Sequence, residues 1–245
     1  MKVGLYVTCL VDLFRPRIGF AALKLLESAG CTVTVPDIQT CCGQPAFNSG
    51  DRDSAIVLAR NVVDAFEQFD YVVAPSGSCA GMIRTHYPDL FADEDEDTRE
   101  RVGRFCSRVH ELTDFLVNVV KWRPTDAVLE GAVTYHDSCS GLRELGIKSQ
   151  PRELLGAVKG LQLKEMAEPE SCCGFGGAFS VKFGEISAHI ADRKCEHVAA
   201  CGASALVLGD LGCMLHIEGR MRRRGDGDTR VLHVAEVLAG LPSKE

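Results

Sequence analysis

Short apolar runs alternate with amphipathic stretches along the first half of the chain. The β-branched run at residues 2–7 predicts a buried strand, and residues 32–36 and 70–74 predict two more. Between these runs, apolar residues recur every three or four positions over residues 18–29 and 55–66, which predicts two helices. Alternating strands and helices are typical of a parallel sheet covered by helices on both faces.

The second half repeats this order of elements. Residues 132–135, 161–164 and 205–208 are again short and apolar, and they predict three strands. Before the last of them, a single helix is predicted from the spacing of four apolar residues: Phe179, Phe183, Ile186 and Ile190.

The cysteines repeat with the same register as the strands. A single cysteine, a Cys-Cys-Gly segment and another single cysteine occur once in each half, at offsets of 130, 131 and 134 residues. These are Cys9, Cys41-Cys42-Gly43 and Cys79, followed by Cys139, Cys172-Cys173-Gly174 and Cys213. We therefore predict an α/β fold of two tandem related units, residues 1–122 and 131–245, each a small parallel sheet flanked by helices.

The four single cysteines each follow the carboxyl end of a predicted strand. In open α/β sheets, ligands bind in the crevice outside those strand ends. Cysteines that are seventy residues apart in sequence are thus expected to meet at one edge of each sheet.

Charge and compartment restrict the chemistry of these cysteines. The 245-residue chain has a net charge of −7 and no broad basic face, which argues against nucleic acid as a partner. No apolar run approaches the ~18 residues of a membrane-spanning helix, and the N-terminus does not read as a signal peptide. We therefore expect a cytoplasmic protein without membrane insertion, whose 12 cysteines stay reduced.

Adjacent cysteines share a site only if the backbone turns sharply, because successive side chains of an extended strand point to opposite faces. Gly43 and Gly174 permit the positive φ that such a turn needs. Four thiolates per unit match the Cys₄ ligation of a [4Fe–4S] or [2Fe–2S] cluster, and also a structural Cys₄ zinc site. The remaining cysteines have no counterpart in the other half and are interpreted as core residues: Cys31, Cys106, Cys195 and Cys201.

The chain resembles the two-repeat Cys-Cys-Gly cysteine-rich family, which includes the heterodisulfide reductase B subunit and the iron–sulfur subunit of glycolate oxidase. The resemblance spans nearly the whole chain and lies in segments such as VTCLVD, CCGQPAFNSG, SGSCAGM, YHDSC, CCGFGGAFSVKFGEIS and HVAEVL. It implies iron–sulfur clusters, of the [4Fe–4S] type, at one or both cysteine sets, with zinc as an alternative at one. It also implies electron transfer in the oxidation of L-lactate to pyruvate, or of a related 2-hydroxy acid such as glycolate.

The resemblance further implies two partner subunits, at least one of which carries ferredoxin-like clusters. This chain departs from the wider family pattern, which closes each unit with Cys-x-x-Cys, because Met82 and His216 stand at the final positions. The missing thiolates argue against the non-cubane cluster of heterodisulfide reductases. His216 is interpreted as an ordinary helix residue rather than a ligand. His136, three residues before Cys139, either lies behind the ligands or simply ends a strand.

The sequence offers an electron carrier's ligands and no evident substrate chemistry. No complete dinucleotide-binding fingerprint and no nucleophile–base motif occurs. We therefore expect an oxidoreductase subunit that is not catalytic alone. The alternative is a non-catalytic scaffold subunit that is braced by zinc or by bare thiols.

Overall fold

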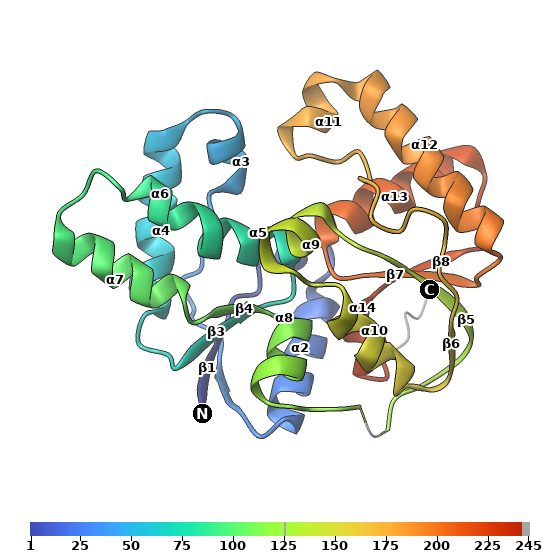
Figure 1. Cartoon of the computed structure of the whole chain (residues 1–245), viewed down its shortest axis with the longest axis horizontal. Coiled ribbons are helices and arrows are strands. Elements are labelled where there is room, and N and C mark those ends of the chain that lie inside the picture. Colours follow the sequence, from blue (N-terminus) through green and yellow to red (C-terminus); the bar gives the residue numbers. More distant parts are fainter. Residues whose placement is uncertain (125, 242–245) are drawn as a thin grey trace.

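A computed structural model of the chain describes residues 1–124 and 126–241 and contains two four-stranded parallel sheets (Figure 1). The first sheet has the order β2-β1-β3-β4 and consists of β1 (Lys2–Leu5), β2 (Thr32–Thr34), β3 (Tyr71–Ala74) and β4 (Val109–Glu111). The second has the order β6-β5-β7-β8 and consists of β5 (Val128–His136), β6 (Lys159–Leu163), β7 (Ala205–Leu208) and β8 (Arg230–His233). The predicted α/β class with two tandem parallel sheets is confirmed.

Helices connect the strands in both halves. Those of the first half are α1 (Cys9–Phe14), α2 (Pro16–Ser28), α3 (Gln44–Asn48), α4 (Arg52–Phe66), α5 (Gly77–Gly81), the π-helix η1 (Met82–His86), α6 (Tyr87–Leu90), α7 (Glu96–Cys106), α8 (Leu112–Asp114) and the π-helix η2 (Phe115–Val119). Those of the second half are α9 (Cys139–Leu145), α10 (Ser149–Gly156), α11 (Ala178–Lys182), α12 (Gly184–Cys201), α13 (Leu211–Arg224) and α14 (Val234–Leu238). None of the described helices is long and apolar enough to cross a membrane.

Apolar side chains are buried on both faces of the first sheet. Leu5 and Val73 point to the face covered by α2, whereas Tyr6 and Val72 point to the face covered by α4 and α7. The core on the α2 side continues without interruption into the second sheet, where it includes residues such as Val207. The two halves therefore share one hydrophobic core.

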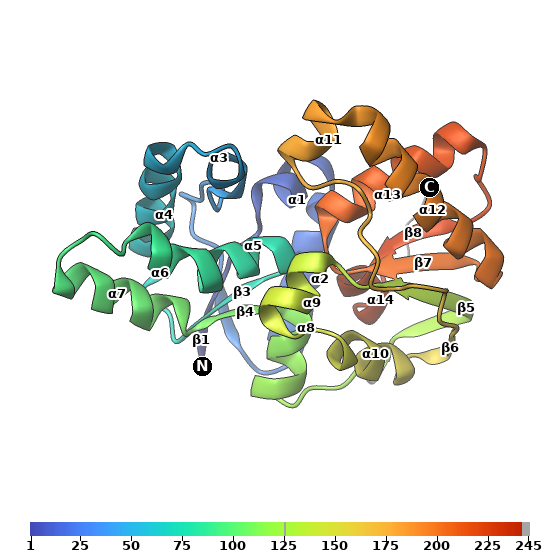
Figure 2. The same cartoon turned by 45° about the horizontal axis from the view of Figure 1, so that its top comes forward.

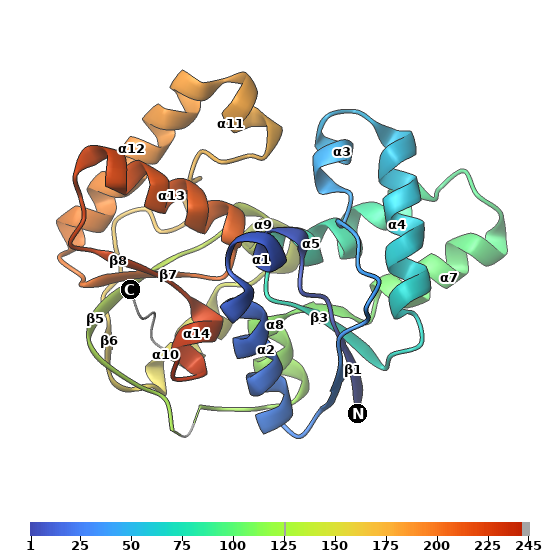
Figure 3. The same ribbon diagram turned by 180° about the vertical axis from the view of Figure 1, so that it is seen from behind.

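Four pairs of helices pack across the boundary between the halves, and these contacts form two equivalent sets. Helix α5 of the first half packs on α9 of the second, and α1 packs on α13. In the same way α2 packs on α14, and α8 packs on α10 (Figures 2 and 3). Because α1 corresponds to α9 and α5 to α13, the halves are related by an approximate twofold axis. The unit boundaries 1–122 and 131–245 stay a prediction, and residues 242–245 of the second unit lie outside the described residues.

The single helix predicted around Phe179 is wrong in two respects. The chain breaks between α11 and α12 at Phe183, whose φ of −128° and ψ of 53° are not helical. Phe183 and Ile186 are also more than half exposed, although they were expected to face the core. The buried face of α12 includes Ala191, Val198 and the long side chain of Lys194 instead.

Candidate metal centres

The first set of cysteines comes together at the carboxyl edge of the first sheet. Cys9 begins α1, Cys41 and Cys42 lie in the turn before α3, and Cys79 lies in α5. Their side chains form a chain of sulfur contacts, from Cys9 to Cys41, to Cys42 and to Cys79. Cys42 is buried, and the other three are half-buried.

The second set repeats this arrangement at the edge of the second sheet. Cys139 begins α9, Cys172 and Cys173 lie in the turn before α11, and Cys213 lies in the first turn of α13. The sulfur contacts run from Cys139 to Cys172, to Cys173 and to Cys213, and the last two Sγ atoms are 3.2 Å apart. The structure therefore brings together both predicted groups of four thiols, and their role as ligands stays a prediction.

Both Cys-Cys-Gly segments turn through a glycine in the left-handed region, as the sequence indicated. Gly43 has a φ of 85° and Gly174 a φ of 91°. The turn at Gly174 also points main-chain N–H groups at sulfur, because Gly174 N donates to Cys172 Sγ at 3.3 Å and Phe175 N donates to Cys173 Sγ at 3.4 Å. Such N–H groups stabilise a thiolate, which is the form of cysteine that binds metal.

Hydrogen bonds between the sulfurs give each set one acidic thiol. Thiol hydrogen bonds from Cys42 and Cys9 lower the pKa of Cys41 to about 2. Hydrogen bonds from two cysteines of its own set lower the pKa of Cys172 to about 2 as well. The thiol that donates from Cys9 has a pKa well above its usual range for the same reason. A metal bound by all four sulfurs would displace the remaining protons.

His136 ends β5 and is buried beside the second set. Burial lowers its pKa to about 3, so the imidazole is neutral. Neither ring nitrogen forms a hydrogen bond of normal geometry with any described residue. One ring nitrogen and the Sγ atoms of Cys173 and Cys213 all lie within 4.8 Å of one another. His136 therefore both ends a strand and lies directly beside the thiols of the second set.

Asp210 connects the two sets, although the sequence analysis did not single it out. Its Oδ1 atom accepts hydrogen bonds from the main-chain N–H groups of Gly212 and Cys213, at 3.1 and 3.4 Å. Its Oδ2 atom accepts from Ser78 N at 2.8 Å and from Ser76 Oγ at 3.1 Å, both in the first half. The carboxylate is buried and lies between Cys213 of the second set and Ser78, the residue before Cys79 of the first set. An aspartate just before a helix is an N-cap signal, which is the one trace of this role in the sequence.

Known proteins share this pattern of sequence and fold. The family model for the cysteine-rich domain called CCG matches residues 3–84 and 133–218. The chain belongs to the CCG cysteine-rich family. Among curated members, "Lactate utilization protein A 2" of Bacillus cereus (strain 03BB102) is 43% identical over 98% of both chains. "Lactate utilization protein A" of Geobacillus kaustophilus (strain HTA426) is 48% identical over 97% of this chain and 98% of its own.

A solved structure has a similar fold. A hypothetical protein from Helicobacter pylori superposes with a TM-score of 0.67 at 11% identity. The superposition covers all of this chain and 49% of that one, so this CCG protein spans about half the length of its structural relative. At this identity the likeness shows the fold alone.

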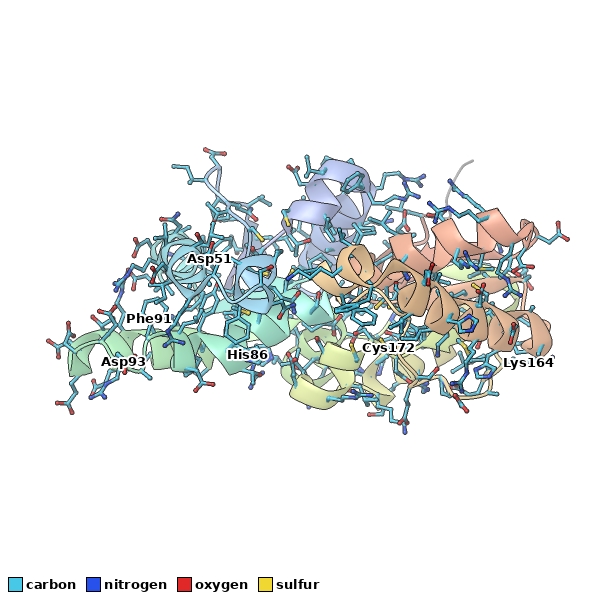
Figure 4. All side chains as sticks on the ribbon, turned by 90° about the horizontal axis from the view of Figure 1, so that it is seen from above. Asp51, His86, Phe91, Asp93, Lys164 and Cys172 are labelled. Atoms are coloured by element: carbon cyan, nitrogen blue, oxygen red, sulfur yellow. The ribbon has the colours of Figure 1, made fainter. Side chains whose placement is uncertain are left out.

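In this CCG protein, the two cysteine sets open on different cavities. Cys9 and Cys41 line a groove of about 570 Å³ between α1 and the loop after β2. All four cysteines of the second set line a cavity of about 340 Å³ between the halves, to which the first half contributes residues such as Gln44 and His86. Figure 4 shows His86 and Cys172 on opposite sides of this boundary. Each set is therefore within reach of a molecule that binds in its own cavity.

Met82 and His216, which replace the final cysteine of the Cys-x-x-Cys pattern, make contacts that argue against a role as metal ligands. His216 Nε2 contacts Ser187 Oγ at 3.1 Å, and this hydroxyl donates to the carbonyl of Gly174 at 2.7 Å. His216 thus braces the second Cys-Cys-Gly turn from outside. Met82 is fully buried in the core on the α4 side. The four cysteines without counterparts are also buried, as expected for core residues.

Proposed function

We propose that this chain is an iron–sulfur electron-transfer subunit that serves the oxidation of L-lactate to pyruvate or of a related 2-hydroxy acid. The observation that carries the proposal is the pair of matching four-sulfur sets, each at the carboxyl edge of its own sheet and each open to its own cavity. A relay needs two places where electrons enter and leave. Two sets that open on separate cavities meet that requirement.

The donor set fits iron–sulfur clusters, preferably of the [4Fe–4S] type. Cys9, Cys41, Cys42 and Cys79 would hold one cluster, and the four equivalent cysteines of the second half would hold the other. Such clusters supply one-electron oxidation and reduction when they are bound. The chain's own contribution is to present the thiolates, to turn the Cys-Cys-Gly backbone, and to link the two sets through the buried carboxylate of Asp210.

The substrate and the partners follow from the relatives alone. The similar curated proteins carry the name lactate utilization protein A, which supports a role in lactate utilisation. Oxidation of lactate to pyruvate removes two electrons, whereas each proposed cluster accepts one, so another centre or a pair of clusters must couple the two steps. We infer two partner subunits, at least one of them with ferredoxin-like clusters, and a cytoplasmic location.

Metal analysis of the anaerobically purified chain tests the two ligand sets. The unchanged chain should contain iron and acid-labile sulfide and should absorb near 400 nm. Cys42→Ser should remove about half of the iron, and adding Cys173→Ser should remove the rest. Cys106→Ser and Cys201→Ser are matched controls, because both residues are buried cysteines outside the sets. Unchanged iron in the double variant would refute the ligand assignment.

Turnover measurements test the relay role and the substrate. The isolated chain should not reduce a dye with L-lactate until the partner subunits are added. Deletion of its gene should abolish growth on L-lactate in a strain without other lactate dehydrogenases. Robust turnover by the isolated chain would contradict the relay role, and normal growth of the deletion strain would contradict the substrate.

A zinc-braced scaffold is the second candidate, and one observation favours it. The nitrogen of His136 and the sulfurs of Cys173 and Cys213 lie as close together as the ligands of a single metal ion do. A colourless chain with about one zinc and no sulfide would support this candidate. A brown chain with iron and sulfide at both sets would eliminate it.

A further inference from the structure

The two cysteine sets have different neighbours at one equivalent position of the fold. Cys9 and Cys139 are equivalent at an offset of 130, and the same offset places His136 where the first half has Tyr6. The strand pairing agrees, because Leu5 pairs with Val73 just before Tyr6 and Tyr135 pairs with Val207 just before His136. Tyr6 directly follows β1, His136 is the last residue of β5, and each of the two residues lies behind a cysteine set.

Tyr6 has a hydrogen-bond partner within its own half. Its side chain is fully buried, and its hydroxyl donates to the carbonyl of Thr40 at 2.7 Å. Thr40 precedes Cys41, so this contact fixes the start of the first Cys-Cys-Gly turn. The polar atom of Tyr6 is thus already used, and it has no donor left for the sulfurs.

His136 lacks such a partner. Its ring is 1% exposed, and neither nitrogen forms a normal hydrogen bond within the part of the chain that the structure describes. The carbonyl of Pro169 interacts with the His136 ring, but without the geometry of a normal hydrogen bond, and it already accepts from Asp137 N at 3.1 Å and from Lys194 Nζ at 3.3 Å. Two donors occupy both lone pairs of a carbonyl oxygen. A buried N–H without an acceptor destabilises a protein, so the imidazole N–H is expected to find its acceptor elsewhere.

The sulfurs of the second set are the acceptors within reach. The His136 nitrogen and the Sγ atoms of Cys173 and Cys213 form a group of atoms that all lie within 4.8 Å. The second half already supplies four thiolates, as many as a [4Fe–4S] cluster has irons. The His136 imidazole is therefore not needed as a fifth ligand, and it can act as a hydrogen-bond donor to sulfur.

A second difference between the halves concerns the helix that packs on each Cys-Cys-Gly turn. The Cys-Cys-Gly glycines contact equivalent helices, since Gly43 approaches Ala55 and Leu58 as Gly174 approaches Ser187 and Ile190, each at an offset of 132. The same offset places Lys194 of α12 where α4 has an apolar residue, Val62.

Lys194 brings a cation close to the second set. Its side chain is fully buried, and its Nζ atom donates to the carbonyls of Glu168 and Pro169, at 2.7 and 3.3 Å. The ammonium also interacts electrostatically with Cys173 and Cys213. The carboxylate of Asp210 bonds to main-chain N–H groups beside both sets, but its negative charge acts on Cys139 and Cys213 of the second set and opposes the effect of the Lys194 ammonium there.

We propose that His136 donates an N–H hydrogen bond to a sulfur of the second centre, and that this contact, together with the Lys194 ammonium, gives that centre a higher reduction potential than the first. Here a centre is the cluster held by one cysteine set, so the inference rests on the proposed function. Reduction adds negative charge, and a hydrogen-bond donor or a nearby cation stabilises that charge. Electrons that enter the chain then reside mainly on the centre beside the cavity between the halves.

Single-centre variants measure the difference directly. Cys42→Ser should keep only the second centre, and Cys173→Ser only the first. Anaerobic potentiometric titration at fixed pH, followed by electron paramagnetic resonance, should give the Cys42→Ser chain the more positive midpoint potential. Equal potentials, or the reverse order, would overturn the proposal.

Substitution of His136 in the Cys42→Ser chain tests the cause. His136→Phe removes the donor and should lower the equilibrium constant for reduction about tenfold, which is about 59 mV for a one-electron couple. His136→Gln retains an amide N–H and should lower it less. Tyr6→Phe is the matched control, because it removes a hydroxyl at the equivalent position of the other half, and it should leave this potential unchanged.

The remaining outcomes separate the inference from the proposed function. An unchanged potential in an iron-loaded His136→Phe chain overturns the inference and leaves the proposed function intact. Loss of iron from a folded His136→Phe chain identifies the imidazole as a ligand and overturns the donor role. A parent chain without iron and sulfide overturns the proposed function and the inference with it. If His136→Phe does not fold, His136→Leu provides the same comparison.

Discussion

Glu111 provides a test of how the two halves are joined. This carboxyl group ends β4, is 3% exposed and lines a small cavity with Tyr135 and Gly209 of the second half. Its Oε2 atom accepts hydrogen bonds from the main-chain N–H groups of Thr113 and Asp114. Burial raises the pKa of Glu111 to about 7 despite these hydrogen bonds, from an ordinary value of 4.5.

The sign of the pH dependence follows from this shift. Between pH 4.5 and 7 the unfolded chain releases the proton of Glu111 while the folded chain keeps it, so this group makes the protein less stable as the pH rises. At 1.36 kcal/mol per pKa unit, the total loss is about 3 kcal/mol. Roughly 2 kcal/mol of it falls between pH 5.5 and 8, a range in which the measurement is practical.

Glu111→Gln keeps the size of the side chain and removes its titration. The difference in free energy of unfolding between the variant and the unchanged chain should shift by about 2 kcal/mol in favour of the variant from pH 5.5 to pH 8. Urea unfolding at the two pH values, under anaerobic conditions, measures this shift. Glu111→Asp retains an ionisable group and should retain most of the slope. A difference for Glu111→Gln that is the same at both pH values would refute the reasoning.

Two further predictions concern the second Cys-Cys-Gly turn. Gly174→Ala should remove most of the metal from the second set, because the new Cβ would lie 2.5 Å from the carbonyl oxygen of Ser187 at a φ of 91°. Gly43→Ala should remove less from the first set, since its closest contact is 3.2 Å, and metal per chain measures both. His216→Ala should leave metal content and electron paramagnetic spectra nearly unchanged, because His216 contacts Ser187 rather than sulfur. An altered signal would assign it to the ligands.

Local patterns in the sequence were sufficient to predict the repeated fold and the gathering of the cysteines. The offsets between cysteines and strands are properties of the chain itself, and parallel strands place their carboxyl ends at one edge. The positive φ at Gly43 and Gly174 was predictable for the same reason, because two neighbouring thiols can meet only if the backbone turns.

The groups around the cysteines were not predictable in this way. Asp210 acquires its role by receiving hydrogen bonds from Ser76 and Ser78, which are more than 130 residues away in the sequence. Lys194 occupies a buried position of α12 that a pattern of apolar residues would assign to a hydrophobic side chain. The exposed Phe183 illustrates the converse error. At Lys194 and Phe183 the packing of the whole molecule decided against the local preference, whereas Asp210 adds contacts from the other half to its local role as a helix cap.

The paired contacts between the halves have the form of an isologous interface, in which each surface is used twice. If one half existed as a separate protein, the surfaces that join α1 to α13 and α5 to α9 could join two copies of it into a symmetric homodimer. In such a homodimer every substitution would appear in both sites at once. Tandem fusion in one chain removes that constraint, so one position can hold Tyr6 in one copy and His136 in the other. The shared core keeps the copies together while their metal sites are free to diverge.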